Sequence, residues 1–555
     1  MRTLLELLAA RPGEAWILLL ASLLIHLLGM SGTLFVILVF NNYLPHGVDA
    51  TLLSLAAGAC ILALLEFALR EARKQIAGAL SEGSPPAPAA LGALVRSRLG
   101  ALEALPAGAR HDAPRALEQR ARVLVPAFVN GLLDLPFAAL YLAALYLLSI
   151  PLGLIASGAA ALLLALGLGQ QRALGRAERG LAAVEQEARA AFVTALDAPE
   201  ALRAFNWAQL LEPRWRVRQA QAAASRLALL EGQETLQHSG LLVLALLGLV
   251  VTSVGAWLAF SGALSVGALI GANLFAARAA APLLRLLQTA HTLAEADAAS
   301  ARLAALARLP REPEGGTALS AYSGRLELAD AAFAYPGSPA PLFERLSLVI
   351  EPGSLVTVIG PNGSGKSTLL QMLAGLREPL RGRVLAEGVD LRQLAPPWWR
   401  ERVGYVPQEP LFFDGSVREN LACLAPGADA ARLNEATRAA GLLEWLDRSP
   451  RGFDTPIVEG GRQLAFGVRK RLALARAYLA SPALYLLDEP SEGLDEAGRA
   501  ALYAALNELY KSGATLVVAS ADPAILCAAR VTIDLGAKPV PRLVYTERLI
   551  QAAGV

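Results

Sequence analysis

Lysine and arginine are absent from three long stretches of this 555-residue chain. The stretches run from Arg11 to Arg70, from Arg122 to Arg172 and from Arg226 to Arg278, and each spans about 50 to 60 residues. Each has room for two apolar helices of roughly 20 residues, the length that crosses a bilayer, and a turn between them. The pattern predicts six membrane helices in three hairpins. Composition agrees, because 55% hydrophobic and 18% charged residues make a chain more apolar than ordinary soluble proteins.

We expect the membrane helices at about residues 15–40, 49–70, 124–147, 152–170, 238–261 and 264–286, in a transmembrane domain covering 1–309. The first turn is expected at 41–47. The intervening stretches 70–122 and 172–226 are rich in arginine, so the positive-inside rule predicts that both, like the two termini, are cytoplasmic. They are expected to be long helical extensions of the membrane segments.

Charge and cysteine content exclude several function classes. The 50 basic and 48 acidic residues nearly cancel, so no nucleic-acid partner is expected. Three widely separated cysteines exclude a disulfide scaffold and a cysteine zinc site. Asp134 falls inside the third apolar segment, and a carboxylate there indicates either a transport role or a role in helix packing.

The pattern of apolar and polar residues changes after the membrane segments. A polar stretch rich in proline and glycine predicts a linker at 310–324, and short apolar strands alternating with helices predict an α/β domain at 325–555. Within it, the apolar run 355–359 leads directly into a glycine-rich loop and a helix, which is the context of a nucleotide P-loop. The predicted phosphate-binding residues are Gly360, Pro361, Asn362, Gly363, Ser364, Gly365, Lys366, Ser367 and Thr368.

The P-loop residues predict ATP and Mg²⁺ as cofactors. Lys366 is expected to neutralise the β- and γ-phosphates and Ser367 to hold Mg²⁺. About 120 residues further on, the apolar run 484–487 ends in Asp488 and Glu489. Asp488 suits the Mg²⁺ shell, and Glu489 is the candidate catalytic residue that polarises the attacking water.

With these motifs in this order, the chain resembles an ABC exporter half-transporter with the type IV exporter fold, along nearly its whole length. The resemblance implies an ATPase and translocase whose six-helix domain precedes a P-loop nucleotide-binding domain. It further implies that Tyr335 stacks on adenine and that Gln408 is the glutamine that senses Mg²⁺ and the membrane domain. Asp495 corresponds to the aspartate of the D-loop.

Two positions depart from the family pattern. The signature, usually Leu-Ser-Gly-Gly-Gln, here reads Leu464, Ala465, Phe466, Gly467 and Val468. Ala465 has no hydroxyl, and Phe466 is bulky where close approach to a phosphate needs no side chain. Ala521 stands at the switch-histidine position, and none of the five histidines lies in the nucleotide-binding domain.

In this family both positions supply groups that face a γ-phosphate, and the signature does so across a dimer, so Ala521 weakens one composite site and the altered signature weakens the other. We therefore expect a heterodimer with a second ABC half-transporter, in which this chain is the degenerate half; a homodimer is the alternative. One reading is that hydrolysis depends on the partner and that this chain is mainly a regulatory ATP-binding subunit. The intact Glu489 argues for its own hydrolysis.

The membrane segments resemble one particular group of ABC exporters. Residues 35–45, 133–137 and 265–270 are similar to type I secretion exporters. This implies export of a polypeptide across a bacterial inner membrane, with a membrane-fusion protein and an outer-membrane channel as partners and the nucleotide-binding domain in the cytoplasm. An exporter of lipid, glycan or drug is the alternative, since nothing in the membrane helices identifies the cargo.

Overall fold

The computed structural model describes residues 9, 11–82, 92, 94–106, 113–123, 125–197 and 199–545. The chain forms two compact units. One comprises Met1–Val95 and Leu105–Leu309, and the other comprises Arg96–Ala104 and Pro310–Val555. The second unit is therefore discontinuous in sequence, because a short segment of the first arginine-rich stretch folds with it.

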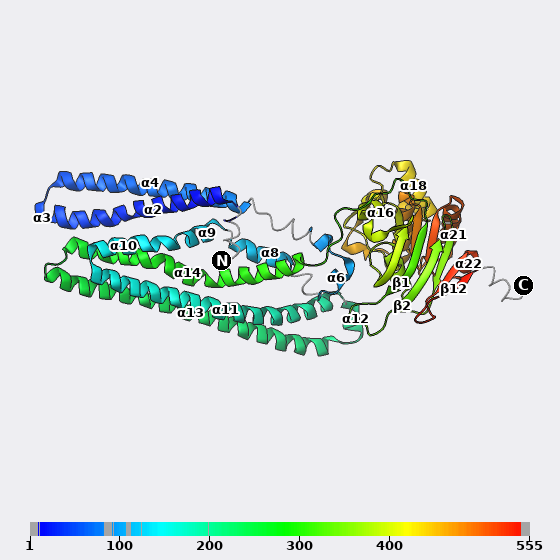
Figure 1. Cartoon of the computed structure of the whole chain (residues 1–555), viewed down its shortest axis with the longest axis horizontal. Coiled ribbons are helices and arrows are strands. Elements are labelled where there is room, and N and C mark those ends of the chain that lie inside the picture. The colour runs from blue at the N-terminus through cyan, green and yellow to red at the C-terminus, as the bar shows by residue number, and fades with distance from the viewer. Residues whose placement is uncertain are drawn as a thin grey trace, which may run out of the picture. The chain divides into compact units, whose positions relative to one another are not determined.

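The first unit is a bundle of long helices (Figure 1). Helices α2 (Pro12–Leu38) and α4 (Asp49–Glu82) form one hairpin, and α10 (Ala138–Leu148) and α11 (Ile150–Asp197) the next. The third consists of α13 (Ala208–Phe260) and α14 (Val266–Ala307). Shorter helices join them: α3 (Leu44–His46), α8 (Ala113–Arg122), α9 (Pro126–Leu133) and α12 (Pro199–Ala204).

Among the described residues, six helical segments are long and apolar enough to cross a membrane. They are Pro12–His46, Asp49–Ala79, Phe128–Leu148, Ile150–Gly169, Ala208–Phe260 and Val266–Thr289. Helices α11 and α13 run far beyond 20 residues because their arginine-rich parts, built of Ala, Leu, Glu and Arg, continue the same helices. The first unit is thus a domain with six apolar helices of membrane-spanning length among the described residues.

The first hairpin differs from expectation at its turn. Residues 41–47 are mostly helical, since a π-helical turn, η1 (Val39–Tyr43), continues α2 into α3. The chain reverses only at Gly47, whose φ of 65° lies in the left-handed region that glycine adopts readily. Polar Asn41 misleads a sequence reading here, because its side chain accepts a hydrogen bond from the Gly267 amide of α14 (3.2 Å) instead of marking a loop.

Helices α2 and α14 approach each other closely at Gly267. A Cβ atom on Gly267 would lie 2.6 Å from the Ile37 carbonyl oxygen and 2.5 Å from Asn41 Oδ1. Such distances are shorter than any real Cβ contact, so the absence of a side chain allows the two backbones to meet. This contact fixes the first hairpin against α14.

The second unit is built on two sheets. A six-stranded sheet has the order β12-β11-β3-β10-β9-β6, in which β12 alone is antiparallel to its neighbour. Its strands are β3 (Leu355–Ile359), β6 (Val403–Val406), β9 (Leu484–Asp488), β10 (Thr515–Ala519), β11 (Val531–Asp534) and β12 (Arg542–Tyr545). The antiparallel sheet β2-β1-β4-β5 is made of β1 (Leu326–Phe333), β2 (Phe343–Ile350), β4 (Arg381–Ala386) and β5 (Val389–Asp390), and a small pair joins β7 (Gly415–Ser416) to β8 (Pro456–Ile457).

Helices cover the parallel strands, which explains their composition. Strands β9 and β10 are buried along their whole length and read as nearly continuous apolar runs, as parallel strands covered on both faces do. The principal helices are α15 (Lys366–Leu373), α16 (Pro396–Arg400), α17 (Val417–Ala422), α18 (Ala430–Ala439), α19 (Leu443–Arg448), α20 (Phe466–Ala480), α21 (Glu496–Lys511) and α22 (Pro523–Ala528). The carboxyl ends of β3, β10 and β9 lie side by side, and ligands of such sheets bind at this edge.

Candidate active site

The glycine-rich loop connects β3 to α15 at the carboxyl edge of the sheet. Gly365 precedes α15 with a φ of 108°, which a residue with a side chain rarely adopts. The loop therefore curls over the first amides of α15, and a helix N-terminus attracts anions. A cavity of about 540 Å³ opens here. It is lined by Tyr335, Leu342, Pro361, Asn362, Gly363, Ser364, Gly365, Lys366, Ser367, Thr368, Gln408, Asp488, Glu489 and Glu492.

The Lys366 ammonium lies at the centre of the loop. It donates a hydrogen bond to the Gly360 carbonyl oxygen (3.0 Å), and its Nζ is 3.4 Å from Glu489 Oε1. The lysine is thus held by the loop on one side and by the carboxylate on the other.

Asp488 ends β9 and faces the loop. It is 1% exposed, and its Oδ1 atom has no hydrogen-bond partner among the described residues. Burial raises the pKa of this carboxyl, although a hydrogen bond with Ser367 and the charges of Lys470 and Lys366 lower it. A buried acid oxygen without a donor, next to a hydroxyl, fits a hard divalent cation such as Mg²⁺.

Glu489 follows in an unusual backbone conformation. Its φ is 44°, in the left-handed region, and its amide donates to the Ala519 carbonyl oxygen of β10 (2.8 Å). Burial raises the pKa of its carboxyl in spite of the neighbouring Lys366. A non-glycine residue held in this region is strained, and such strain is concentrated at functional sites.

Tyr335 and Gln408 complete the lining of the cavity. The Tyr335 hydroxyl lies 2.8 Å from Thr368 Oγ1, and the Arg377 guanidinium carbon is 5.2 Å from the centre of its ring. Tyr335 is 41% exposed, so part of its side chain is accessible to a planar ligand. Gln408 donates from Nε2 to Glu492 Oε2 (3.1 Å). The structure thus brings the predicted P-loop residues from Pro361 to Thr368, Tyr335, Gln408, Asp488 and Glu489 to one cavity, whereas Gly360 contacts it only through its carbonyl bond to Lys366.

The signature residues lie outside this cavity, at the start of α20. Ala465 is the N-cap of α20, and no side chain caps the helix. A serine there would accept a hydrogen bond from a first-turn amide, a contact that contributes about 1 kcal/mol in typical helices. The Phe466 ring packs on Gly493, where a Cβ atom would lie 2.3 Å from the ring carbon Cδ1. Leu464 and Val468 pack against the core beneath.

The remaining two predicted positions are Asp495, which ends the acidic turn 488–495, and Ala521, which follows β10. Asp495 caps α21 by accepting from the Gly498 amide (2.8 Å) and pairs with Arg471 of α20. The Gly498 amide first, and then Arg471, hold the pKa of the Asp495 carboxyl below its ordinary value. Ala521 is exposed beyond the end of β10 and has no group that can donate a hydrogen bond from its side chain.

Sequence reasoning missed three residues that contact the site: Arg377, Lys470 and Glu492. Lys470 is the least expected, because it is 2% exposed and lies in a helix that is otherwise apolar on its inner face. Burial lowers its pKa to about 8, against the opposing charges of Glu492, Asp488, Glu489 and Glu409. The sequence offered little signal for this role, because Lys470 lies between Arg469 and Arg471 and reads as part of a basic cluster.

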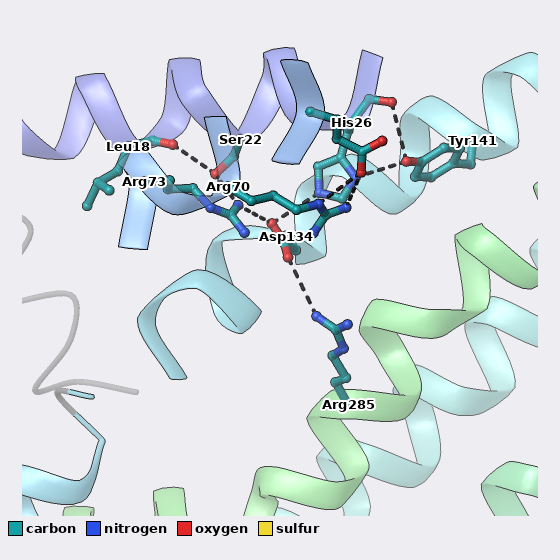
Figure 2. Close-up of polar contacts among 9 residues, drawn as sticks. Leu18, Ser22, His26, Arg70, Arg73, Asp134, Tyr141 and Arg285 are labelled. Atoms are coloured by element: carbon teal, nitrogen blue, oxygen red, sulfur yellow. Dashed lines mark hydrogen bonds and ion pairs between the residues drawn. The ribbon is translucent and has the colours of Figure 1, made fainter. Parts of the chain in front are cut away.

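A second cluster of buried ions lies in the first unit, around Asp134 (Figure 2). Arg73 of α4 donates to Asp134 Oδ1 (2.6 Å) and to Ser22 Oγ of α2 (2.8 Å). His26 Nε2 lies 3.1 Å from the same carboxylate oxygen, and its Nδ1 lies 3.1 Å from the Tyr141 hydroxyl. Arg285 of α14 approaches the other oxygen at 3.8 Å. The ions satisfy one another across four helical segments, which favours the packing role over a free transport carboxylate.

The fold and the site define an ATP-binding subunit of a multi-pass membrane transporter. Residues 343–492 match the ABC transporter family model. The chain is 34% identical over 418 residues to the mycobactin import ATP-binding/permease protein IrtB of Mycolicibacterium thermoresistibile, covering 73% of this chain and 70% of that protein. The chain therefore belongs to the ABC transporter family.

Other relatives match different shares of the chain. ABC transporter B family member 13 of Arabidopsis thaliana is 37% identical over 204 residues, 37% of this chain, and the match spans only 16% of that protein. The cyclolysin secretion/processing ATP-binding protein CyaB of Bordetella pertussis is 28% identical over 552 residues, which is 97% of this chain and 76% of that protein.

A solved structure shares the fold. It is that of a bacterial Atm1-family ABC exporter with ATP bound, with a TM-score of 0.80, 20% identity, and coverage of 97% of this chain and 96% of that one. The chain thus has the ABC exporter fold.

Proposed function

We propose that this chain is an ATP-hydrolysing subunit of an ABC exporter. The observation that carries the proposal is the convergence of Lys366, Asp488 and Glu489 on one cavity at the edge of the sheet. Lys366 is placed to neutralise phosphate charge, and Glu489 to polarise a water attacking the γ-phosphate. Ser367, Gln408 and Asp488 are the residues that would hold Mg²⁺, which would supply positive charge against the phosphates of ATP.

The working unit is a heterodimer with a second ABC half-transporter. Ala465 leaves α20 without a side-chain cap, and the Phe466 ring occupies the space above Gly493. An N-terminus so changed offers a partner's nucleotide fewer donors than one capped by serine and followed by glycine. A partner with an intact signature would supply those donors to the ATP held by Lys366.

The cargo is a polypeptide moved across the inner membrane of a bacterium, with a membrane-fusion protein and an outer-membrane channel. The support is the likeness to CyaB, a secretion protein by name, along 97% of this chain. IrtB is named for mycobactin import, so export of a lipid, glycan or drug-like molecule, or uptake of a small one, is the competing outcome.

A regulatory subunit is the second candidate. It is favoured by Ala521, which offers no side-chain donor at the end of β10, and by the packing of Phe466 within its own chain. In that case this chain binds ATP to close the dimer while its partner hydrolyses.

The test is affinity purification of the tagged chain from its native membrane, with mass spectrometry of what accompanies it. Recovery of a second ABC half-transporter supports the heterodimer, and a co-recovered membrane-fusion protein supports polypeptide export. The ATPase rate of the purified complex is then compared with that of the Glu489→Gln variant. We expect a loss of about 100-fold or more, since a positioned base contributes at least that much. A matched change at exposed Glu508, Glu508→Gln, should leave the rate unchanged. An unchanged rate in Glu489→Gln would instead assign hydrolysis to the partner.

A further inference from the structure

Lys470 is buried next to the acidic turn 488–495, and it does not line the nucleotide cavity. Its Nζ donates to the backbone carbonyl oxygens of Asp488 (3.1 Å) and Glu489 (2.9 Å). A buried cation is costly unless its donors are satisfied. Here two of its three donors are spent on the main chain of the two acidic residues that the proposed hydrolysis needs.

The two carbonyls belong to the strained part of the turn. Glu489 has a φ of 44°, and β10 holds its amide through the Ala519 carbonyl. Lys470 holds its carbonyl on the opposite side. Glu489 is therefore clamped at both ends of its backbone, and the clamp directs its carboxylate towards Lys366 of the P-loop, 3.4 Å away. Strained conformations of this kind persist only where surrounding contacts over-determine them.

Phe466 shields the same ammonium. The centre of its ring is 5.5 Å from Lys470 Nζ, a distance at which an aromatic face attracts a cation. The edge of the ring lies against Gly493, which has no side chain and a φ of 72°. One turn further along α20, Arg471 pairs with Asp495. The start of α20 thus contacts the turn 488–495 through a ring, an ammonium and a guanidinium, all within one chain.

We propose that Lys470 is a positioning residue for Glu489, and that the Phe466 ring shields the Lys470 ammonium. The residue that weakens the signature thereby supports the chain's own hydrolytic carboxylate. The inference rests on the proposed function, because it requires Glu489 to act in hydrolysis. It adds that a change at the start of α20 alters the rate at this chain's own nucleotide site, and not only at the partner's.

The test compares three variants of the full chain, each purified with whatever partner accompanies it. Lys470→Met keeps the length and removes the donors, and Lys470→Gln keeps a neutral donor. Lys511→Met is the matched control, because Lys511 is exposed on α21 and only pairs with Glu508. ATP affinity, steady-state kcat and thermal stability are measured for each.

We expect Lys470→Met to lower kcat by about 10- to 100-fold with ATP affinity changed less than about threefold, since a misplacement of roughly 1 Å can cost 100-fold. Lys470→Gln should recover part of the rate, and Lys511→Met should match the unaltered chain. If Lys470→Met does not fold, the Lys470→Gln and Phe466→Leu variants decide, since both must lower kcat at unchanged ATP affinity. An unaltered kcat in the folded variants overturns the proposal.

Glu489→Gln separates this proposal from the proposed function. If Glu489→Gln abolishes hydrolysis while Lys470→Met retains the full rate, only the positioning role is wrong. If Glu489→Gln has no effect, hydrolysis by this chain is wrong and Lys470 has no carboxylate to position. If both variants lose activity, the double variant should be no slower than Glu489→Gln alone, because the two residues act in one step.

Discussion

At the scale of the residue, Gly267 shows how one missing side chain sets the distance between two helices. Its α-carbon faces the Ile37 carbonyl oxygen, and an added Cβ would lie 2.6 Å from that backbone atom. A backbone oxygen in a helix cannot move aside as the end of a long side chain can. The close approach therefore depends on glycine, in contrast to most glycines of the membrane helices.

We expect Gly267→Ala to destabilise the membrane unit by about 1–3 kcal/mol, the usual cost of overpacking. Gly158→Ala is the control, because nothing lies within 4 Å of its Cβ position and α11 is helical there. That change should be neutral or stabilising by up to about 1 kcal/mol, the helix-propensity difference. Thermal unfolding of the purified variants checks both; equal behaviour would mean that the α2–α14 contact is not tight.

At the scale of the element, the Asp134 cluster joins helical segments that carry no local signal of their pairing. Arg73 and Asp134 are 61 positions apart, and the carboxylate lies where α9 gives way to the turn before α10. Asp134 is 3% exposed, so its charge depends on these partners. Through these hydrogen bonds and ion pairs, the cluster therefore joins α2 and α4 to the following helices.

Removing one partner of this buried pair should be far more costly than breaking an exposed pair. We expect Asp134→Asn or Arg73→Met to destabilise the chain by about 3–5 kcal/mol, because each leaves a buried charge unpaired. The Arg73→Met and Asp134→Leu double variant should recover much of the loss. Glu71→Gln, which breaks the exposed pair with Lys74 on the same helix α4, should cost less than about 1 kcal/mol.

The measurement is chemical or thermal unfolding of the four variants in one detergent. Transport assays then separate packing from a role in cargo movement. If Asp134→Asn is as stable as the unaltered chain but fails to transport, the transport interpretation of Asp134 replaces the packing interpretation.

The sequence predicted the nucleotide site far better than the contacts behind it. The P-loop, Asp488 and Glu489 are recognisable because phosphate binding needs a fixed order of residues within a strand, a loop and a helix. Lys470 and Phe466 were not recognisable as supports of Glu489, because their contacts cross from α20 to the turn 488–495 and leave no periodic trace. Likewise, polar Asn41 indicated a turn, whereas its side-chain oxygen accepts a hydrogen bond from the Gly267 amide of α14.

At the scale of the whole molecule, the nucleotide cavity and the signature at the start of α20 differ in how closely they follow the family pattern. The P-loop residues from Pro361 to Thr368, together with Asp488 and Glu489, line one cavity, whereas α20, which starts within the signature, has no side-chain cap. In the proposed heterodimer, the ATP held by this chain's P-loop would face Ala521 at the switch position, and the partner's ATP would face a signature without its serine and first glycine. Each composite site would therefore carry one departure from the family pattern.

The short segment Arg96–Ala104 has a consequence for how the chain can be cut. It folds with the nucleotide-binding unit, and its helix α6 (Leu99–Glu103) and flanking residues carry ion pairs from Arg98 to Glu378 (2.7 Å) and from Glu103 to Arg377 (2.6 Å).

A protease site inserted between Glu314 and Gly315 would sever the peptide link, yet the downstream fragment should stay in the membrane pellet. The side chains of Arg98, Glu378 and Glu103 are 42–45% exposed, whereas that of Arg377 is 8% exposed. Salt screens the exposed charges, so washing at high ionic strength should weaken the pairs and release the fragment. Arg98→Ala with Arg377→Ala should release it at low salt as well. If instead the intact pairs fail to retain the fragment at low salt, the covalent link alone joins the nucleotide-binding unit to the rest of the chain.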